Sequence, residues 1–297
     1  MLAGGDSQRF GSDKLRFQID GRPMLARVVD VMREVTDRVV VSVRDPRMAR
    51  RLTEAAPPGV TWFADRPDLG GAGPGAGMLT ALDRLDVGEI LFAPGDMPWL
   101  SPEALRELIR QAKGKGATSA APIWPDGWTE PLVQWQRVTP WRGKLGALPT
   151  RGRQGTRPTD LLRGGRVVVL FPVALLSDDP RCFSNVNEPG ELGGRSVSAQ
   201  EGTRSLPNVR SVNARRAFWA AASASAREEA AVASRSFQKE ALLHARSRIA
   251  HLAVHALEDA LRCAREAGLA TLRLEERLSD VKGTMHAQGA STRVPPG

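Results

Sequence analysis

The chain has 297 residues, of which 41% are hydrophobic and 25% charged, an ordinary composition for a globular protein of one large or two smaller domains. Its two cysteines show no C-x-x-C spacing, and no apolar run approaches the roughly 18 residues of a membrane span, which argues against a disulfide framework, a thiol-metal site and a membrane protein. The formal net charge is +9, but both signs are interleaved without a long basic run beside aromatic residues. We therefore expect a cytoplasmic protein without a membrane or nucleic-acid partner.

Up to about residue 207, short apolar runs alternate with amphipathic stretches, which is typical of an α/β fold around a mostly parallel sheet. Leu25, Val28, Val29 and Met32 recur at helical spacing, and Ser101 followed by a proline is a typical helix start. The expected helices are 23–35, 46–55, 76–85 and one that begins at 102. The expected strands are 38–43, 60–63, 89–93, 119–123, 132–135 and 167–171.

The last third of the chain has a different composition. Residues 193–211 are polar and predict a linker, and alanine, arginine, glutamate and leucine then dominate at helical periodicity. We expect an α/β domain over 1–207, a small C-terminal α-helical appendage of two or three helices over 208–282, and a disordered tail over 283–297. The glycine- and arginine-rich segment 142–158 is predicted to be a mobile loop.

The segment that carries most chemical information is 2–14, Leu-Ala-Gly-Gly-Asp-Ser-Gln-Arg-Phe-Gly-Ser-Asp-Lys. It is predicted to leave the end of a strand as a loop whose glycines let backbone N–H groups approach a ligand closely. Arg9 and Lys14 would supply positive charge to phosphate groups. The segment is neither a Walker A loop nor G-x-G-x-x-G, so it predicts phosphate binding by another kind of loop.

This segment resembles the signature loop of nucleotidyltransferases with a Rossmann-like core, particularly the molybdenum cofactor guanylyltransferase (MobA-like) family. The loop alone is shared by several nucleotidyltransferase families, but further segments are similar to this family's motifs in order and spacing. They are Gly-Pro-Gly-Ala-Gly at 73–77, Gly-Asp-Met-Pro at 95–98, Glu-Pro-Leu at 130–132 and Phe-Ser-Asn-Val-Asn-Glu-Pro-Gly-Glu-Leu at 183–192. The Asn-Val-Asn element favours the guanylyltransferase, and the resemblance covers residues 1–192.

The resemblance implies transfer of GMP from GTP to the phosphate of molybdopterin or Mo-molybdopterin, with release of pyrophosphate. The attacking phosphate is already an anion, so catalysis requires positioning and charge neutralisation more than a proton acceptor. This fits the absence of histidine from the first 243 residues. Mg²⁺ is the expected metal, and other proteins of molybdenum cofactor maturation are potential partners.

The resemblance also assigns individual residues. Lys14, Arg9 and Asp96 are the expected catalytic residues, with Asp96 the metal ligand at the end of a strand. Asn185 and Asn187 are expected to bind the pterin substrate. Asp65 corresponds to the family's acidic residue ahead of the second motif, although Asp68 competes for that position. The expected nucleotide-binding residues are Leu2, Ala3, Gly4, Gly5, Lys14, Asp65, Gly77 and Asp96.

The chain departs from the family at three places. A hydrophobic strand precedes Leu-Ala-Gly-Gly in the family, and only Met1 and Leu2 stand in its place here. Gly75 replaces a leucine and Gly95 a small residue or cysteine. We expect both replacements to loosen packing without removing a functional group.

Alternatives remain open at the level of function. A molybdopterin cytidylyltransferase or a sugar- or alditol-phosphate nucleotidyltransferase would use the same first loop. A non-catalytic module for molybdoenzyme maturation is the alternative of another class, favoured by the short first strand and opposed by Lys14, Asp96 and the two asparagines. A basic nucleic-acid binder ranks third. His244, His251 and His255 are spaced for one helix face, which we interpret as the solvated side of an amphipathic helix and not as a metal site.

Overall fold

The computed structural model describes residues 1–4, 14–66, 68, 73–149, 151, 155–186, 208–209 and 212–290. Its centre consists of two groups of strands. One is the parallel pair β3 (Val40–Val43) and β4 (Thr61–Ala64). The other has the spatial order β5 (Glu89–Phe92), β7 (Gln134–Arg137), β6 (Ser119–Ile123), β8 (Val168–Pro172) and β9 (Asn208–Val209).

The second sheet is mixed. β7 runs antiparallel to both β5 and β6, while β6 and β8 are parallel, so β5, β6 and β8 share one direction. β9 pairs antiparallel with β8 and places residues from the expected linker in the sheet. The strands β1 (Gln18–Ile19) and β2 (Arg22–Pro23) form a separate small hairpin.

The first residues of the chain join the two groups of strands. Leu2 forms parallel bridges with Ser42 of β3 and with Pro94, which follows β5. Its N–H donates to the carbonyl of Ala93 at 2.8 Å, and its own carbonyl accepts from Gly95 at 2.9 Å. Short as it is, the segment 1–3 occupies a central position in the sheet.

Helices cover both faces of the sheet, and the alternation along β5 shows how. Leu91 packs into a core cluster with residues of α1 (Met24–Arg33), α2 (Pro46–Leu52) and α5 (Pro102–Gly114). Its neighbour Phe92 faces the other way, into a cluster with α4 (Pro74–Arg84) and α6 (Pro158–Gly164). Because successive side chains of a strand point to opposite faces, one strand serves both cores.

The helix starts follow the expected sequence signals. The side chain of Asp45 accepts a hydrogen bond from the Met48 N–H at the start of α2, and that of Ser101 accepts one from Ala104 at the start of α5. Both helices carry a proline at the first position. The remaining short elements are α7 (Val173–Leu176) and the 3-10 turns Lys14–Arg16, Thr53–Ala55, Thr139–Trp141, Leu145–Ala147 and Pro180–Phe183.

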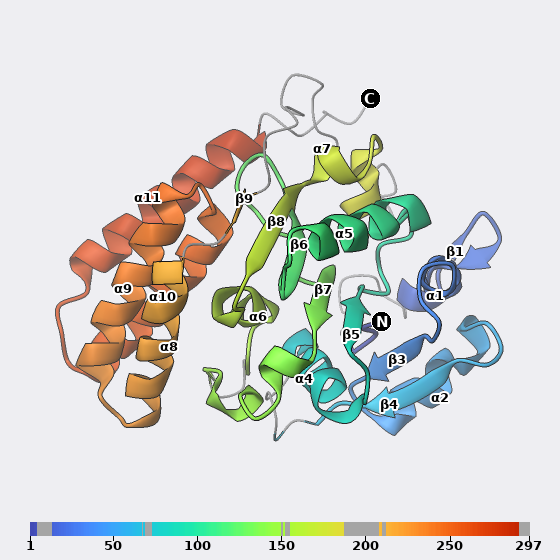
Figure 1. Cartoon of the computed structure of the whole chain (residues 1–297), viewed down its shortest axis with the longest axis horizontal. Helices are drawn as coiled ribbons and strands as arrows, with labels where there is room; N and C mark the ends of the chain where they lie inside the picture. Colours follow the sequence, from blue (N-terminus) through green and yellow to red (C-terminus); the bar gives the residue numbers. More distant parts are fainter. Residues whose placement is uncertain are drawn as a thin grey trace.

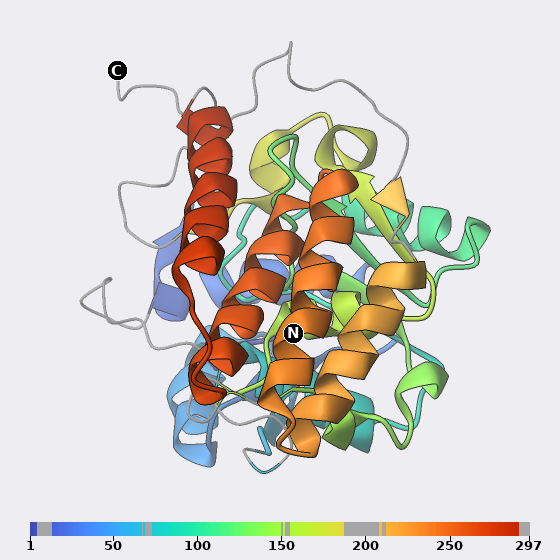
Figure 2. The same cartoon turned by 90° about the vertical axis from the view of Figure 1, so that its left-hand side faces the viewer.

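The C-terminal region forms a helical bundle at one end of the molecule (Figures 1 and 2). Its helices are α8 (Val212–Ala226), α9 (Ala230–Arg246), α10 (Ala250–Glu266) and α11 (Leu272–Ala290). The expectation of two or three helices was therefore too low, and α11 continues past Gly283. The bundle shares a hydrophobic cluster with α4 and α6, through Phe218, Phe237 and Leu257 among others. Within the described residues, no helix has the length and apolar character needed to cross a bilayer.

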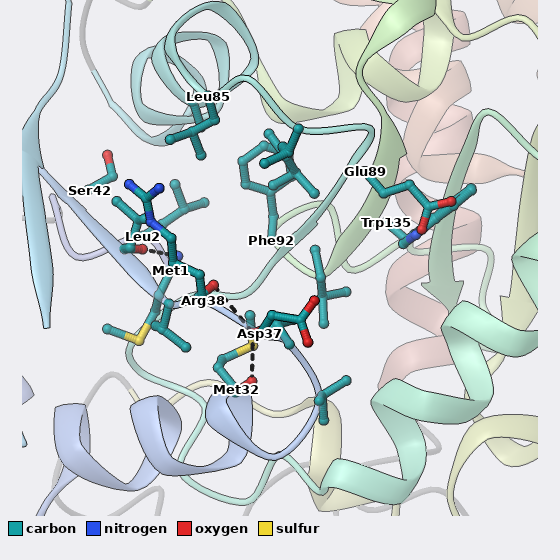
Figure 3. A pocket seen from close by; sticks show the side chains of 18 of the residues that line it. Met1, Leu2, Met32, Asp37, Arg38, Ser42, Leu85, Glu89, Phe92 and Trp135 are labelled. Carbon is teal, nitrogen blue, oxygen red and sulfur yellow. Dashed lines mark hydrogen bonds between the residues drawn. The ribbon is translucent and has the colours of Figure 1, made fainter. Parts of the chain in front are cut away.

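A cavity of about 750 Å³ lies near the amino ends of β3 and β5. Figure 3 shows Met1, Leu2, Leu85 and Phe92 around it. Arg38 and other charged residues also line it, but Lys14, Asp65 and Asp96 do not. The cavity is thus separate from most of the candidate site residues.

Candidate active site

The carboxyl ends of β3, β4 and β5 bring several predicted residues to one edge of the sheet. The segment 2–4 runs parallel to β3 and β5, and Gly4 lies at this edge of the sheet. Asp65 directly follows β4, and Asp96 stands in the loop after β5. Such an edge, built from loops after parallel strands, is where α/β folds commonly bind ligands.

Lys14 and Asp96 form an ion pair at this edge. The Nζ of Lys14 lies 2.5 Å from Oδ2 of Asp96, and the two side chains are only 15% and 16% exposed. The other carboxylate oxygen, Oδ1 of Asp96, is buried and has no hydrogen-bond partner within the described part of the chain. A buried carboxylate oxygen without a partner is costly, so this atom is suited to a ligand.

The segment that carries the first predicted asparagine lies against the same loop. The N–H of Val186 donates to the backbone carbonyl of Asp96 at 3.0 Å. Asn185 is therefore placed beside Asp96 although the two are far apart in the sequence. Asn187, Gly5 and Arg9 fall outside the described residues.

Asp65 is packed between two glycines. A Cβ on Gly77 would lie 3.1 Å from Oδ1 of Asp65, and a Cβ on Gly4 would lie 3.3 Å from Oδ2. Ser42 on β3 donates a hydrogen bond to Oδ1. Burial raises the pKa of the Asp65 carboxyl, and the hydrogen bond from Ser42 opposes that effect.

Asp68, which competes with Asp65 in the sequence, has a different environment. Its carboxylate lies 2.7 Å from the guanidinium of Arg66, and its side chain is 64% exposed. This ion pair lowers the pKa of Asp68. Asp65 is thus the acidic residue that contacts the predicted glycine motifs.

The helix α4 begins in a way that depends on its glycines. Gly73, which precedes the helix, has a φ of 87°, a conformation that a residue with a side chain rarely adopts. A Cβ on Gly75 would lie 1.8 Å from the carbonyl oxygen of Thr156. Our expectation that Gly75 loosens the packing is wrong, because backbone of another segment fills the space of the missing side chain.

Described residues within the predicted loop 142–158 make buried contacts. Arg151 is buried, and its guanidinium binds carboxylates of both α6 and α10. Neither Arg151 nor Ser42 was singled out in the sequence. The signal for Ser42 was a lone hydroxyl in the apolar run of β3, whereas no local pattern marked Arg151.

The interpretation of the three histidines needs correction. His244 lies on α9 and His251 on α10, so the three do not share one helix face. His251 stacks on Trp128 with ring centroids 3.6 Å apart, and burial lowers its pKa to about 3. Both His244 and His251 are buried and not solvated.

The edge residues fit a divalent cation that is bound together with a nucleotide. Among the described residues no group of three or more His, Cys, Asp or Glu side chains is arranged to hold a metal ion. Mg²⁺ in nucleotide sites is commonly held by one or two carboxylates together with phosphate oxygens and water. The buried, unpartnered Oδ1 of Asp96 fits that kind of site.

Comparisons with known proteins find matches over the first part of the chain. Residues 1–164 match the MobA-like NTP transferase domain. A protein of Pyrococcus horikoshii named "Probable molybdenum cofactor guanylyltransferase" is 33% identical over 136 residues, which make up 44% of this chain and 65% of that protein. A protein of the same name from Natronomonas pharaonis is 34% identical over 145 residues, or 47% of this chain and 67% of that protein.

A solved structure shows a similar fold. The molybdopterin-guanine dinucleotide biosynthesis protein A of Archaeoglobus fulgidus is 25% identical and superposes with a TM-score of 0.52, covering 65% of this chain and 93% of that one. The match to the Pyrococcus protein spans slightly less than two thirds of that relative's length. The helical bundle begins beyond the matched residues 1–164.

Proposed function

The chain belongs to the family of MobA-like NTP transferase domains, and on that premise we propose that it transfers GMP from GTP to the phosphate of molybdopterin or Mo-molybdopterin. The observation that carries this proposal is the Lys14–Asp96 pair, with one unpartnered carboxylate oxygen beside the segment 2–4 and Val186. The names of the relatives from Pyrococcus and Natronomonas favour guanine as the base.

In the proposed reaction an oxygen of the molybdopterin phosphate forms a bond to the α-phosphorus of GTP. The bond from that phosphorus to the oxygen bridging to the β-phosphate breaks, and pyrophosphate leaves. No proton has to be removed from the attacking phosphate. The protein's task is to align the two phosphates and to offset their negative charge.

Each edge residue has a role in this proposal. Lys14, together with Arg9, binds phosphate oxygens of the nucleotide. The backbone of Leu2, Ala3, Gly4 and Gly5 lines the nucleotide site, with Asp65 and Gly77 beside it. Asn185 and Asn187 bind the pterin substrate or its phosphate.

Asp96 is the residue that would hold Mg²⁺. When bound, this cation supplies positive charge against the phosphate oxygens. The short contact with Lys14 keeps the Asp96 carboxylate in one orientation, with Oδ2 occupied and Oδ1 available. We place the reaction in the cytoplasm, because Cys182 and Cys263 are both free thiols, as is usual in a reducing compartment.

Calorimetric titration with GTP and with CTP, each with Mg²⁺, tests this function. We expect GTP to bind more tightly, and Lys14→Ala to weaken binding by about tenfold or more, since a charge-assisted contact contributes about 1.5–3 kcal/mol. Lys113→Ala is the matched control, because Lys113 also pairs with a carboxylate, that of Glu89 at 2.7 Å, outside the site.

The possible outcomes separate the alternatives. Preference for CTP would assign the chain to the cytidylyltransferases. Equal weakening by Lys14→Ala and Lys113→Ala would contradict the role given to Lys14. A folded chain that binds neither nucleotide would favour the non-catalytic module.

A further inference from the structure

A cluster of buried charged residues lies between α6 and the bundle. It consists of Arg151, Asp160, Arg163, Glu240 and Asp259, and we call it the Arg151–Asp259 cluster. Each of these residues is at most 8% exposed. The cluster draws its residues from α6, α9, α10 and the segment before α6.

Arg151 is the residue of the cluster that connects it to the segment lying on α4. Its Nε and Nη2 each lie 2.6 Å from an oxygen of Asp259, and its Nη1 and Nη2 lie 2.7 and 3.1 Å from the oxygens of Asp160. Two forked contacts of this kind fix the orientation of a guanidinium plane. Arg151 is therefore held by α10 as firmly as by its own neighbour α6.

Thr156, whose hydroxyl shares an acceptor with Arg151, carries this attachment to α4. The hydroxyl of Thr156 donates to the carbonyl of Pro149, and the carbonyl of Thr156 stands where a Cβ of Gly75 would be. Arg157 adds a second attachment to α10, because its guanidinium lies 2.9 Å from Glu258. Backbone held by the bundle thus lies directly on the first turn of α4.

That first turn borders the proposed nucleotide site. Gly77, two residues after Gly75, lies against Asp65 and Leu2. Further along α4, Met78 and Leu79 share a hydrophobic cluster with Leu257 of α10. A displacement of the turn would therefore move the residues around Asp65.

We propose that α10 fixes the first turn of α4 through Asp259 and, to a smaller extent, through Glu258, which makes Asp259 a positioning residue for nucleotide binding. The link to the nucleotide rests on the proposed function, whereas the link from Asp259 to α4 does not. The bundle would then contribute to nucleotide binding by holding α4 in place.

Hydrogen–deuterium exchange on the full chain, read by mass spectrometry, tests the mechanical link. In Asp259→Asn we expect faster exchange at 155–158 and at 74–78, while α9 and α11 keep their protection. In the same variant GTP with Mg²⁺ is expected to bind about tenfold more weakly, because displacements of ligand-positioning groups of about 1 Å cost this much or more.

Glu240→Gln is the matched control. Glu240 is buried in the same cluster, but it contacts Arg163 at 2.9 and 3.0 Å and does not contact Arg151. We expect it to lower the thermal midpoint without changing exchange at 74–78 or the affinity for GTP. If both variants change exchange at 74–78 equally, or neither does, the positioning role is contradicted and the cluster is structural only.

Glu258→Gln covers the case in which Asp259→Asn does not fold. Glu258 is 28% exposed and holds Arg157, so its loss leaves the buried cluster intact. We expect the same two segments to exchange faster by a smaller factor, and unchanged exchange there would overturn the proposal. If the parent chain binds no GTP, the proposed function fails, while the exchange data still decide whether α10 holds α4.

Discussion

Two regions of this molecule hold paired charges, and they differ in whether every charged atom has a partner. At the sheet edge, Lys14 occupies one oxygen of Asp96, and the other oxygen has no partner among the described residues. In the Arg151–Asp259 cluster, both oxygens of Asp259 accept from arginine side chains. The first region is an incomplete set of interactions and the second is a complete one.

The difference separates charges that hold structure from charges that hold a ligand. A buried network in which each group is bonded stabilises one conformation and loses much when a member is removed. A site with an unpartnered buried oxygen loses less stability when that carboxylate is neutralised, but it loses its capacity to bind. Substitutions in the Arg151–Asp259 cluster should therefore mainly lower stability, whereas substitutions at the sheet edge should mainly lower activity.

Arg163→Met should produce the largest loss of stability. Arg163 is fully buried and binds Asp160, Glu240 and Asp259, which would be left without their shared cation. Removing one partner of a buried ion pair costs about 3–5 kcal/mol in the free energy of unfolding. Urea unfolding measures this, with Arg142→Met, an exposed arginine paired with Asp86, expected to cost less than about 1 kcal/mol.

Asp96→Asn should have the reverse effect. Transfer activity is expected to fall by about 10²–10³-fold, the range for removal of one group that stabilises transition-state charge. The free energy of unfolding should fall by less than in Arg163→Met, because the Lys14–Asp96 pair is partly exposed and involves a single contact. A variant that unfolds as readily as Arg163→Met but keeps full turnover when folded would place Asp96 among the structural charges.

Gly75→Ala tests the contact between the two regions. Its Cβ would meet the carbonyl of Thr156 at 1.8 Å, and overpacking of this kind costs about 1–3 kcal/mol. Gly114→Ala, at the end of α5, meets nothing within 4 Å and should be neutral or stabilising by up to about 1 kcal/mol. Thermal unfolding of the two variants would contradict the account if their midpoints moved together.

The stability of the bundle should depend on pH through its buried histidines. Burial lowers the pKa of His251 to about 3 and also lowers that of His255. Below pH about 6.5 the unfolded chain binds protons that the folded rings do not. The free energy of unfolding therefore decreases as the pH is lowered, by up to about 1.4 kcal/mol per pH unit for each ring.

This loss begins below the unfolded pKa of histidine and is absent above it. In urea unfolding between pH 6.5 and 5, His251→Asn should show a slope smaller than the parent's, by a difference that rises to about 1.4 kcal/mol per pH unit near pH 5. That window lies above the unfolded pKa of carboxyl groups, so Asp259 contributes little there. An unchanged slope would mean that the His251 ring is protonated in the folded chain.

The sequence predicted the elements, and several residues that the structure brings to one edge of the sheet, better than the connections between them. Periodicity and caps located α1, α2 and α5, and motif spacing singled out Lys14, Asp65 and Asp96. The strand expected at 132–135 lies at Gln134–Arg137, because a turn in which Val133 donates to Glu130 delays its start. Such a turn has no glycine to mark it.

The bundle shows a similar limit. The breaks between α8 and α9 and between α9 and α10 fall near Glu228 and Arg248, which adopt φ values of 60° and 56°. Helix ends are usually recognised in a sequence by glycine. Helix ends at non-glycine residues with positive φ values are therefore not predicted. The Arg151–Asp259 contact joins residues more than a hundred positions apart, and no local pattern encodes such a pair.

The most direct test of the account is product formation by the purified chain with GTP, Mg²⁺ and molybdopterin, followed by mass spectrometry and a pyrophosphate assay. We predict a product whose mass is that of molybdopterin plus a guanylyl group, with one pyrophosphate released for each product and little product from CTP. Binding of GTP without pyrophosphate release or a guanylylated pterin would contradict the proposed transfer reaction.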